Sequence, residues 1–354
     1  MFSTKQNSCV HTRALAQLRA NPRYRNYLSG SLVRQFSTFT RRITIVVSIA
    51  MLASCSTGSS TLSSQTSSLT WHVQDGASSR AEALQGLAFY PSAMTIDAGD
   101  TVEWSFPANE PHTVSLLGSG QTKPLPPTDP AAAKPAGGST YDGTAYTSSG
   151  YLFGGKTYSL TFPKQGTYTI YCLIHQPEMV SKVVVQPRGT AYPQQQSAYD
   201  QAAATASASD LAAALASVGT FAYPAGSHHF AAGISPGSLV GPPGSSSVLR
   251  FLSTSDLNVT SATVPAGSTV TWTNLSNNEA HTVTFAPVGR PFPTLNPFAP
   301  PTGGNTYDGT TLVNSGLLFP GQSFSATFPK AGIYTYHCLL HDDTENMIAT
   351  LVVQ

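Results

Sequence analysis

The sequence is poor in charge, since only 10% of its 354 residues are Asp, Glu, Lys or Arg and the formal net charge is +1. Residues 1–54 hold eight of the 18 basic residues and none of the 17 acidic ones, so the remainder carries about seven negative charges. A surface of that sign argues against a nucleic-acid partner. The low charge content, together with 29 Gly and 26 Pro, favours a loop-rich all-β architecture over a helical one.

The N-terminal region also lacks an apolar run long enough to cross a bilayer comfortably. Its longest run, Ile43–Ala53, has 11 residues, the length of the apolar part of a signal peptide. The residues Leu52–Cys55 follow directly and resemble the lipobox of bacterial lipoproteins, in which the cysteine is lipid-modified and becomes the first mature residue. We therefore expect a leader over 1–54, a lipid anchor on Cys55 and a Ser/Thr-rich tether over 55–69. The protein would then be exported to the periplasmic or extracellular face of the cell membrane.

Two other interpretations of the leader stay open. An ordinary secretory signal with an incidental cysteine would export the protein without an anchor. An Arg-rich, acid-free organelle transit peptide fits the composition of residues 1–42 but not the apolar run and Cys55 after it. The pair Arg41-Arg42 is a hint of twin-arginine export.

The rest of the chain contains the same pattern twice. Phe162–Met179 reads FPKQGTYTIYCLIHQPEM, and Phe328–Met347 reads FPKAGIYTYHCLLHDDTENM. Upstream, Asn109–Val114 (NEPHTV) corresponds to Asn278–Val283 (NEAHTV). The offset between the copies is nearly constant, 166 residues for the cysteines and 169 for the upstream histidines. Such a long period indicates the duplication of one domain rather than a solenoid.

We predict two β domains, at 70–186 and 228–354, joined by a linker at 187–227. The alternation of apolar residues predicts strands in the first domain at Trp71–Val73, Gly86–Ile96, Asp100–Phe106, Gly166–Cys172 and Val180–Gln186, with a hairpin at Tyr151–Phe162. The linker contains the Ala-rich stretch Ser197–Val218, which predicts a helix of about five turns. An unstructured linker stays open, because such helices are marginal in water without packing.

Each copy offers one thiolate, two imidazoles and one thioether. These residues are His112, Cys172, His175 and Met179 in the first domain and His281, Cys338, His341 and Met347 in the second. Soft sulfur with imidazole selects copper over magnesium or calcium, and three strong in-plane ligands with a weak axial thioether form a type 1 copper site. A cysteine at a strand end followed by two residues and a histidine lets one tight loop supply two ligands. We therefore predict two type 1 copper ions per chain.

Both halves resemble the plastocyanin-like blue copper proteins, the cupredoxins, over roughly residues 70–186 and 228–354. The resemblance implies two Greek-key β-sandwiches, each of eight strands, with copper near one end and one-electron transfer as the activity. Three residues separate the last histidine from the methionine in the first domain and five do so in the second. The axial position is therefore open to Gln, a backbone oxygen or no ligand.

The function we expect is a relay of single electrons, which needs no small organic substrate and no catalytic residue. The edges of His175 and His341 are expected at the surface, because both lie in the ligand loops. The negative surface suggests a basic redox partner such as a cytochrome or an oxidase domain. The Pro-rich loops Leu117–Gly138 and Pro287–Gly304 are expected to cover the copper end.

Several alternatives remain at this point. Cys172 and Cys338 can in principle form a disulfide, zinc can replace copper, or one of the two sites can be degenerate. The protein can also bind copper without redox activity. The remaining candidates outside the leader, His72, His228, His229 and Met94, are expected to be structural or surface residues.

An enzyme is the other alternative. In copper nitrite reductases and multicopper oxidases a histidine beside the blue-copper cysteine binds a further copper, and His337 stands in that place, with His228 or His229 as a further ligand across a subunit interface. Against this, Tyr171 occupies the position in the first domain and the sequence has no His-x-His pair. The simpler expectation is a strand residue directed away from copper.

Overall fold

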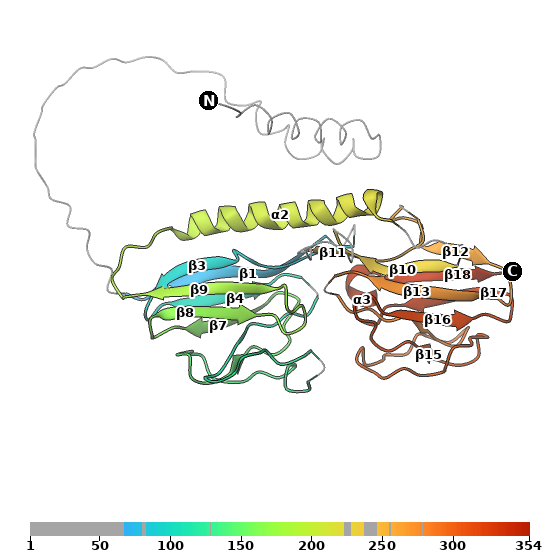
Figure 1. Ribbon diagram of the computed structural model, residues 1–354, viewed down its shortest axis with the longest axis horizontal. Coiled ribbons are helices and arrows are strands. Elements are labelled where there is room, and N and C mark those ends of the chain that lie inside the picture. The colour runs from blue at the N-terminus through green and yellow to red at the C-terminus, as the bar shows by residue number, and fades with distance from the viewer. Residues whose placement is uncertain are drawn as a thin grey trace, which may run out of the picture. The chain divides into compact units, whose positions relative to one another are not determined.

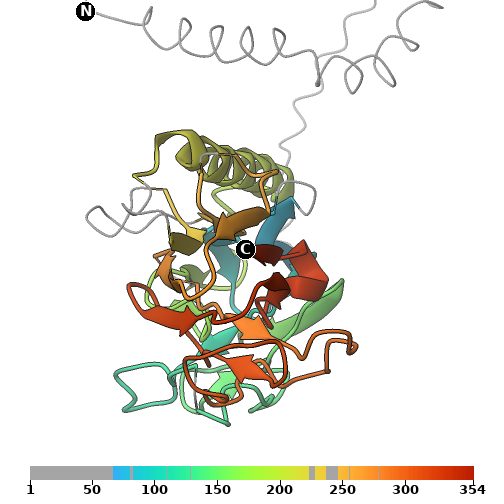
Figure 2. The ribbon, with the colours of Figure 1, turned by 90° about the vertical axis from the view of Figure 1, so that its right-hand side faces the viewer.

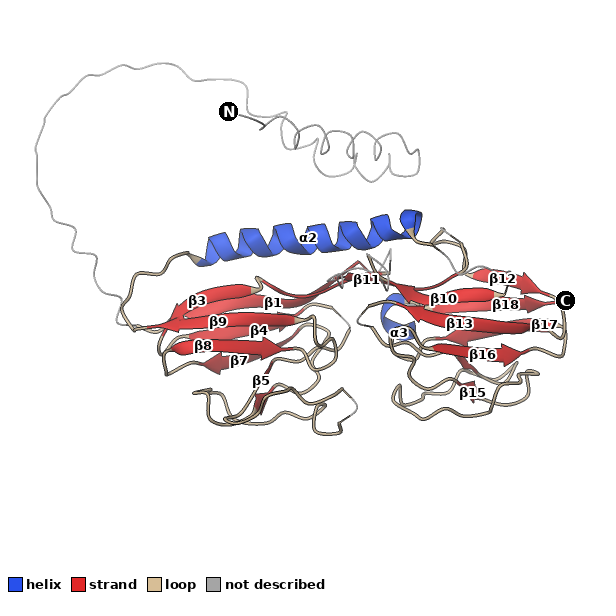
Figure 3. Cartoon of the chain, viewed as in Figure 1, coloured by secondary structure: helices blue, strands red, loops and turns tan. Residues whose placement is uncertain are grey.

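The computed structural model describes residues 67–354 except 80–82, 109, 128, 223–227, 237–245, 255 and 278. These residues are mostly β, with one long helix between two cupredoxin-like regions (Figure 1, Figure 3). The first region contains β1 Thr70–Ser79, β2 Leu84–Tyr90, β3 Ala93–Asp97, β4 Thr101–Phe106, β5 Ser115–Leu116, β6 Thr147–Ser148, β7 Lys156–Thr161, β8 Gly166–Tyr171 and β9 Val180–Gln186.

The second region repeats this order. It contains β10 His229–Ile234, β11 Ser246–Leu252, β12 Ser261–Val264, β13 Thr269–Leu275, β14 Thr284–Phe285, β15 Val313–Asn314, β16 Ser323–Thr327, β17 Gly332–His337, the short helix α3 Asp342–Glu345 and β18 Ile348–Val353. The all-β prediction is confirmed, with nine described strands in each region instead of the eight expected.

Three sheets form the two sandwiches. Two five-stranded sheets have the orders β3-β9-β8-β5-β6 and β12-β18-β17-β14-β15, one in each region. The third has eight strands in the order β16-β13-β10-β11-β2-β1-β4-β7 and therefore runs through both regions. The two regions join in it where β2 pairs antiparallel with β11, with Gln85 opposite Ser247, Gly86 opposite Ser246 and Leu84 opposite Val248.

The apolar residues that alternate along the predicted strands form the cores of the two regions. In β4 the buried residues Val102, Trp104 and Phe106 alternate with more exposed neighbours, as a strand with one face on the core requires. In β13 the residues Val270 and Trp272 are buried in the same way. Each core includes the cysteine and methionine of its own ligand set, so the proposed metal position lies at the margin of a close-packed interior.

Two predicted elements of the first domain are wrong. The segment Gly86–Ile96 does not form one strand, because it breaks at Pro91 and Ser92 and its two parts, β2 and β3, belong to different sheets. The segment Tyr151–Phe162 is not a hairpin. Its first arm bridges His112 through Leu152, whereas its second arm, β7, pairs with β4.

The predicted linker helix is present as α2, Gln196–Thr220, and its 25 residues make about seven turns rather than five. It lies against β1, β2 and β11 (Figures 1 and 2). The hydroxyl of Tyr199 accepts a 2.9 Å hydrogen bond from the backbone N–H of Thr95 in β3. Tyr90 donates a 2.7 Å hydrogen bond to Asp210. Such packing supplies the stability that an Ala-rich helix lacks on its own, so the unstructured alternative is wrong for these residues.

The predicted leader, the lipid-anchor residue Cys55 and residues 55–66 of the predicted tether lie outside the described residues. Within the described part of the chain, none of the helices combines the length and the apolar character that a membrane crossing requires.

Candidate metal centres

Neighbouring strands bring the three strong donors of the first domain together. His112 follows β4 and is fixed by two backbone hydrogen bonds with Leu152, of 2.9 and 3.0 Å. Cys172 directly follows β8, and its N–H donates to the carbonyl of Met179 over 3.0 Å. The N–H of Met179 in turn donates to the carbonyl of His175 over 3.0 Å, so the loop that carries three of the predicted ligands is closed by its own backbone.

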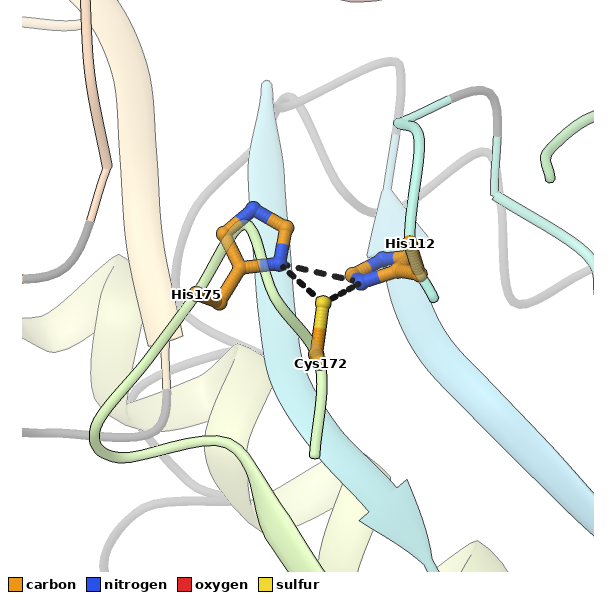
Figure 4. Close-up of side chains that lie close together, drawn as sticks. All are labelled: His112, Cys172 and His175. Carbon is orange, nitrogen blue, oxygen red and sulfur yellow. Dashed lines mark hydrogen bonds between the residues drawn. The ribbon is translucent and has the colours of Figure 1, made fainter. Parts of the chain in front are cut away.

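The donor atoms of this site face one another (Figure 4). Nδ1 of His175 lies 3.4 Å from Sγ of Cys172, and Nδ1 of His112 lies 3.8 Å from it. The two Nδ1 atoms are 3.0 Å apart. All three side chains are buried, with at most 1% of each exposed.

The second domain repeats this geometry. Sγ of Cys338 lies 3.3 Å from Nδ1 of His341 and 3.8 Å from Nδ1 of His281, and the two Nδ1 atoms are 3.2 Å apart. The longer spacing between His341 and Met347 contains the single turn α3, whose C-cap residue Asn346 has a φ of +57°.

The predicted axial residues Met179 and Met347 are both fully buried in the same clusters as their cysteines. Their backbones take part in the ligand loops, since the carbonyl of each accepts a 3.0 Å hydrogen bond from the N–H of Cys172 or Cys338. Their assignment as axial ligands stays a prediction.

The electrostatics favour a thiolate in the first site. Burial opposes ionisation of Cys172, but the positive charge of His175 and hydrogen bonds with both histidines hold the pKa of the thiol well below its usual value. Burial also lowers the pKa of His175, yet the negative charges of Glu279 and Cys172 outweigh it and leave that pKa well above normal. In the second site, burial and the charge of His341 hold the pKa of His281 well below its usual value.

Copper fits both donor sets. Each set places one sulfur and two imidazole nitrogens within 4.8 Å of one another in a buried position, and a methionine lies in the same cluster. These are the donors that a type 1 copper ion takes. Both cysteines are free, so the alternative of a disulfide between Cys172 and Cys338 is wrong.

Two glycines that sequence reasoning missed make room for the upstream histidines. A Cβ added to Gly76 would lie 2.3 Å from Nε2 of His112, and one added to Gly233 would lie 2.1 Å from Nε2 of His281. Both glycines also have positive φ, +72° and +76°. The recurrence of a glycine within each domain's first strand, at the point where the pairing register shifts, was the signal available in the sequence.

Buried carboxylates are the second group that the sequence analysis missed. Asp75 is fully buried beside His112, with Oδ1 3.8 Å from Nδ1, and neither of its oxygens has a hydrogen-bond partner. The equivalent residue of the second domain is Ala232, as the matching strand registers show. Glu110 and Glu279 are also buried, and each stands two residues before an upstream histidine.

The expectation that His175 and His341 lie at the surface is wrong, because both are 0% exposed. Their Nε2 atoms face the carboxylates of Glu110 and Glu279, which come from both domains. The Pro-rich loop Leu117–Gly138 was expected to cover the copper end, and one contact agrees with this. Gln176, next to His175, donates a 2.6 Å hydrogen bond to the carbonyl of Leu125 in that loop.

His337 lies apart from the donor sets. Its ring stacks on Phe292 with centroids 3.7 Å apart, and its Nδ1 is 3.0 Å from Oδ2 of Asp342. Three groups of described residues could hold a metal ion, and none includes His337. His72 is at the surface, with 58% of its side chain exposed, and Met94 is a core residue, both as expected.

A β-sandwich that holds a buried His, Cys, His and Met group at one end defines the cupredoxin class. The family model for copper binding proteins of the plastocyanin/azurin family matches residues 77–186 and 255–354, more than half of the chain. The chain therefore belongs to the plastocyanin/azurin family and contains two tandem copper-binding domains, and the two buried groups are consistent with two type 1 copper sites.

Three individual proteins are similar to parts of this chain. Plastocyanin A'/A'' of Nicotiana tabacum is 33% identical over 102 residues, which cover 28% of this chain and 89% of that protein. A methionine-to-glutamine mutant of amicyanin in the Cu(I) state is 22% identical, with 33% of this chain and 82% of that chain covered and a TM-score of 0.23. An oxidised methionine-to-lysine mutant of amicyanin is 27% identical, with coverages of 27% and 70% and a TM-score of 0.20.

Proposed function

We propose that this protein is a blue copper electron carrier with two type 1 sites, exported and anchored to the cell membrane through a lipid on Cys55. The observation that carries the redox part is the repeated convergence of Cys172 or Cys338 with two Nδ1 atoms in a buried position. Copper, when bound, supplies the one-electron couple. The chain supplies a fixed donor set, because its loops are closed by backbone hydrogen bonds and its histidines are held by buried neighbours.

Metal analysis and a visible spectrum test the redox function. The chain from residue 56 onward, loaded with Cu(II), is expected to bind two copper ions and to show an intense thiolate-to-copper band. Cys172→Ser and Cys338→Ser are each expected to remove one copper and about half of the band, because each removes one thiolate. A reversible one-electron wave for each site separates a carrier from a protein that only stores copper. A colourless copper-loaded chain would contradict the proposal.

The carrier function is proposed in place of an enzyme. His337 is held by Phe292 and Asp342 rather than by a second donor set among the described residues. The variant His337→Ala is therefore expected to keep two copper ions per chain and the wild-type spectrum. A third copper that this variant loses, together with nitrite reduction or oxygen consumption by the wild type, would make the protein an enzyme.

The partner is proposed to be a basic redox protein such as a cytochrome or an oxidase domain. The excess of acidic residues beyond residue 54 supports this, because opposite charges speed encounter and salt screens them. The second-order rate of electron transfer to a basic cytochrome is expected to fall as ionic strength rises. A rate that is independent of salt, or that increases with it, would argue against a basic partner.

Export and anchoring are tested in cells. The full chain is expected in the membrane fraction, with a lipid found by mass spectrometry on the N-terminal peptide. The variant Cys55→Ala is expected to lose the lipid, and Cys9→Ala serves as the matched control because Cys9 lies in the predicted leader. A soluble cytoplasmic wild-type chain would rule out this part of the proposal.

A further inference from the structure

The histidines of the two ligand loops meet at a pair of carboxylates between the domains. His175 and Glu110 come from the first domain, and His341 and Glu279 come from the second. At most 2% of each side chain is exposed. The glutamates occupy equivalent positions of the two copies, two residues before an upstream ligand, so the duplication itself supplies one histidine and one glutamate from each side.

Each carboxylate approaches both imidazoles. Oε2 of Glu279 lies 3.5 Å from Nε2 of His175 and 3.8 Å from Nε2 of His341, so one oxygen stands between the two rings. Glu110 places Oε1 3.7 Å from Nε2 of His175 and Oε2 3.1 Å from Nε2 of His341. Both Nε2 atoms are buried and make no aligned hydrogen bond.

The chemistry of the two histidines assigns a role to these contacts. In each ring Nδ1 faces its own cysteine sulfur, and Figure 4 shows the other nitrogen of His175 directed away from Cys172. A neutral imidazole that gives Nδ1 to a metal carries its proton on Nε2 and donates it to a neighbouring acceptor. A carboxylate is the strongest such acceptor in a protein. Two donors and two carboxylates therefore complement each other here.

Charge balance points the same way. A Cu(II) ion with one thiolate carries one net positive charge, so two oxidised sites match the two negative carboxylates between them. Apolar residues line a cavity of about 370 Å³ beside the two carboxylates, among them Pro111, Ile174, Ala280, Phe298 and Leu340. The two glutamates are themselves buried, and burial strengthens the interaction of each carboxylate with both sites.

We propose that Glu110 and Glu279 couple the two copper sites into one electron-exchanging pair. An electron that enters either site passes through the contact between His175, the carboxylates and His341 to the other site. The step converts Cu(I) and Cu(II) into Cu(II) and Cu(I), with no proton or ligand transferred. This inference rests on the proposed electron-carrier function and adds that the loop histidines face each other rather than an external partner.

The first experiment measures the effect of a residue in one domain on the site in the other. In the full chain with Cys338→Ser, only the first site binds copper. Adding Glu279→Gln is expected to raise the equilibrium constant for reduction of the first site by at least about tenfold, because a negative charge near its histidine is lost. Glu110→Gln is expected to do the same to the second site in a Cys172→Ser chain.

Asp75→Asn is the matched control. Asp75 is as buried as the two glutamates but lies beside His112 of the first domain. It is expected to leave the reduction equilibrium of the second site unchanged, whatever its effect on the first. If Glu279→Gln leaves the first site unchanged, the coupling is wrong.

The second experiment follows electron exchange directly. Met347→Gln alters the predicted axial residue of the second site only, so the two sites acquire different spectra. After a pulse that reduces a small fraction of the copper, the electrons are expected to redistribute at a rate independent of protein concentration. Glu110→Ala with Glu279→Ala is expected to slow this phase severalfold. The isosteric pair Glu110→Gln with Glu279→Gln keeps an acceptor oxygen at each position. This chain is expected to retain the fast redistribution phase.

Three results would overturn the inference while leaving two blue coppers in place. They are a redistribution rate proportional to protein concentration, a rate unchanged in the double alanine chain, and a third metal ion per chain that the double glutamine chain loses. The last result would make the four residues a ligand set instead. Absence of the two blue bands from the wild type would overturn this inference and the proposed function together.

Discussion

The hydroxyl of Thr113 accepts a 2.8 Å hydrogen bond from the backbone N–H of Leu173, the residue that follows the thiolate ligand of the first site. Thr282 makes the same bond, also 2.8 Å long, to Leu339 in the second site. Each threonine directly follows an upstream histidine, so one short segment supplies a ligand and fixes the backbone beside another.

Thr113→Val is expected to destabilise the metal-free chain by about 1–3 kcal/mol, because a buried N–H loses its acceptor. It is also expected to shift the thiolate-to-copper band of the first site, since the backbone next to Cys172 is released. Chemical unfolding and the visible spectrum measure the two effects. Thr113→Ser keeps the hydroxyl and is expected to preserve the spectrum, whereas equal loss in both variants would contradict the role of this bond.

Gly76→Ala is expected to disrupt the first copper site while leaving the second intact. The new methyl would lie 2.3 Å from Nε2 of His112 and would have to displace the ring. Copper stoichiometry is therefore expected to fall from two to one. Gly155→Ala is the matched control, because its φ of +82° brings the same backbone strain of about 1–2 kcal/mol but no atom lies within 4 Å of the new methyl. Loss of copper in both variants would assign the effect to strain instead.

Asp75→Ala is expected to stabilise the metal-free chain by about 1 kcal/mol or more near neutral pH, since a buried carboxylate without a hydrogen-bond partner disappears. The second domain already uses alanine at this position, Ala232. Chemical unfolding measures the change. Asp97→Ala is the contrasting control, because the Asp97 carboxylate accepts hydrogen bonds from Gly189 and Gln186. This variant is expected to lower the free energy of unfolding by about 1–3 kcal/mol. A destabilised Asp75→Ala chain would show that this carboxylate has a favourable partner.

Acid sensitivity is expected from a repeated loop contact. Asp142 accepts hydrogen bonds from Thr144 and Lys164, which lower its pKa to about 2, and Asp308 does so with Thr310 and Lys330. A lowered pKa in the folded state contributes stability that is present above the unfolded value near 3.8 and is lost as pH falls through about 2.

The chain with Asp142→Asn and Asp308→Asn is therefore expected to melt below the wild type at neutral pH. The difference is expected to shrink as the pH falls below about 4, as thermal unfolding of the metal-free chains would show. The chain with Lys164→Gln and Lys330→Gln keeps the hydrogen bonds from the threonines to the two aspartates. Its melting temperature at neutral pH is therefore expected to fall less. A difference that stays constant down to pH 2 would mean that the ionised carboxylates are not the cause.

Sequence patterns predicted that each cysteine lies beside two histidines because the repeat shows the same residues twice, and the structure brings those three side chains together in each domain. Cys172 and His175 lie in one tight loop, and the strands that carry this loop follow a clear alternation of apolar residues. Glu110 and Glu279 were visible as part of a repeated motif, but their role depends on how two domains pack. The same packing places a glutamate of the other domain beside each of His175 and His341, and both histidines are buried.

Other errors have local causes. The segment Gly86–Ile96 has β propensity throughout, yet Pro91 lacks the N–H that a continuous ladder needs, so the chain changes sheets there. The end of α2 was set too early because composition alone does not show that Phe221 and the sheet beneath the helix extend its packing. Helix termini depend on such tertiary contacts.

The register between β2 and β11 has a consequence for the origin of the chain. Gln85 pairs with Ser247, its own equivalent in the other copy, and the flanking pairs exchange equivalent positions around it. This self-complementary pairing is the geometry of an isologous twofold dimer. The duplicated chain therefore has the architecture of a homodimer whose two protomers have become one polypeptide, with α2 in the connection between them.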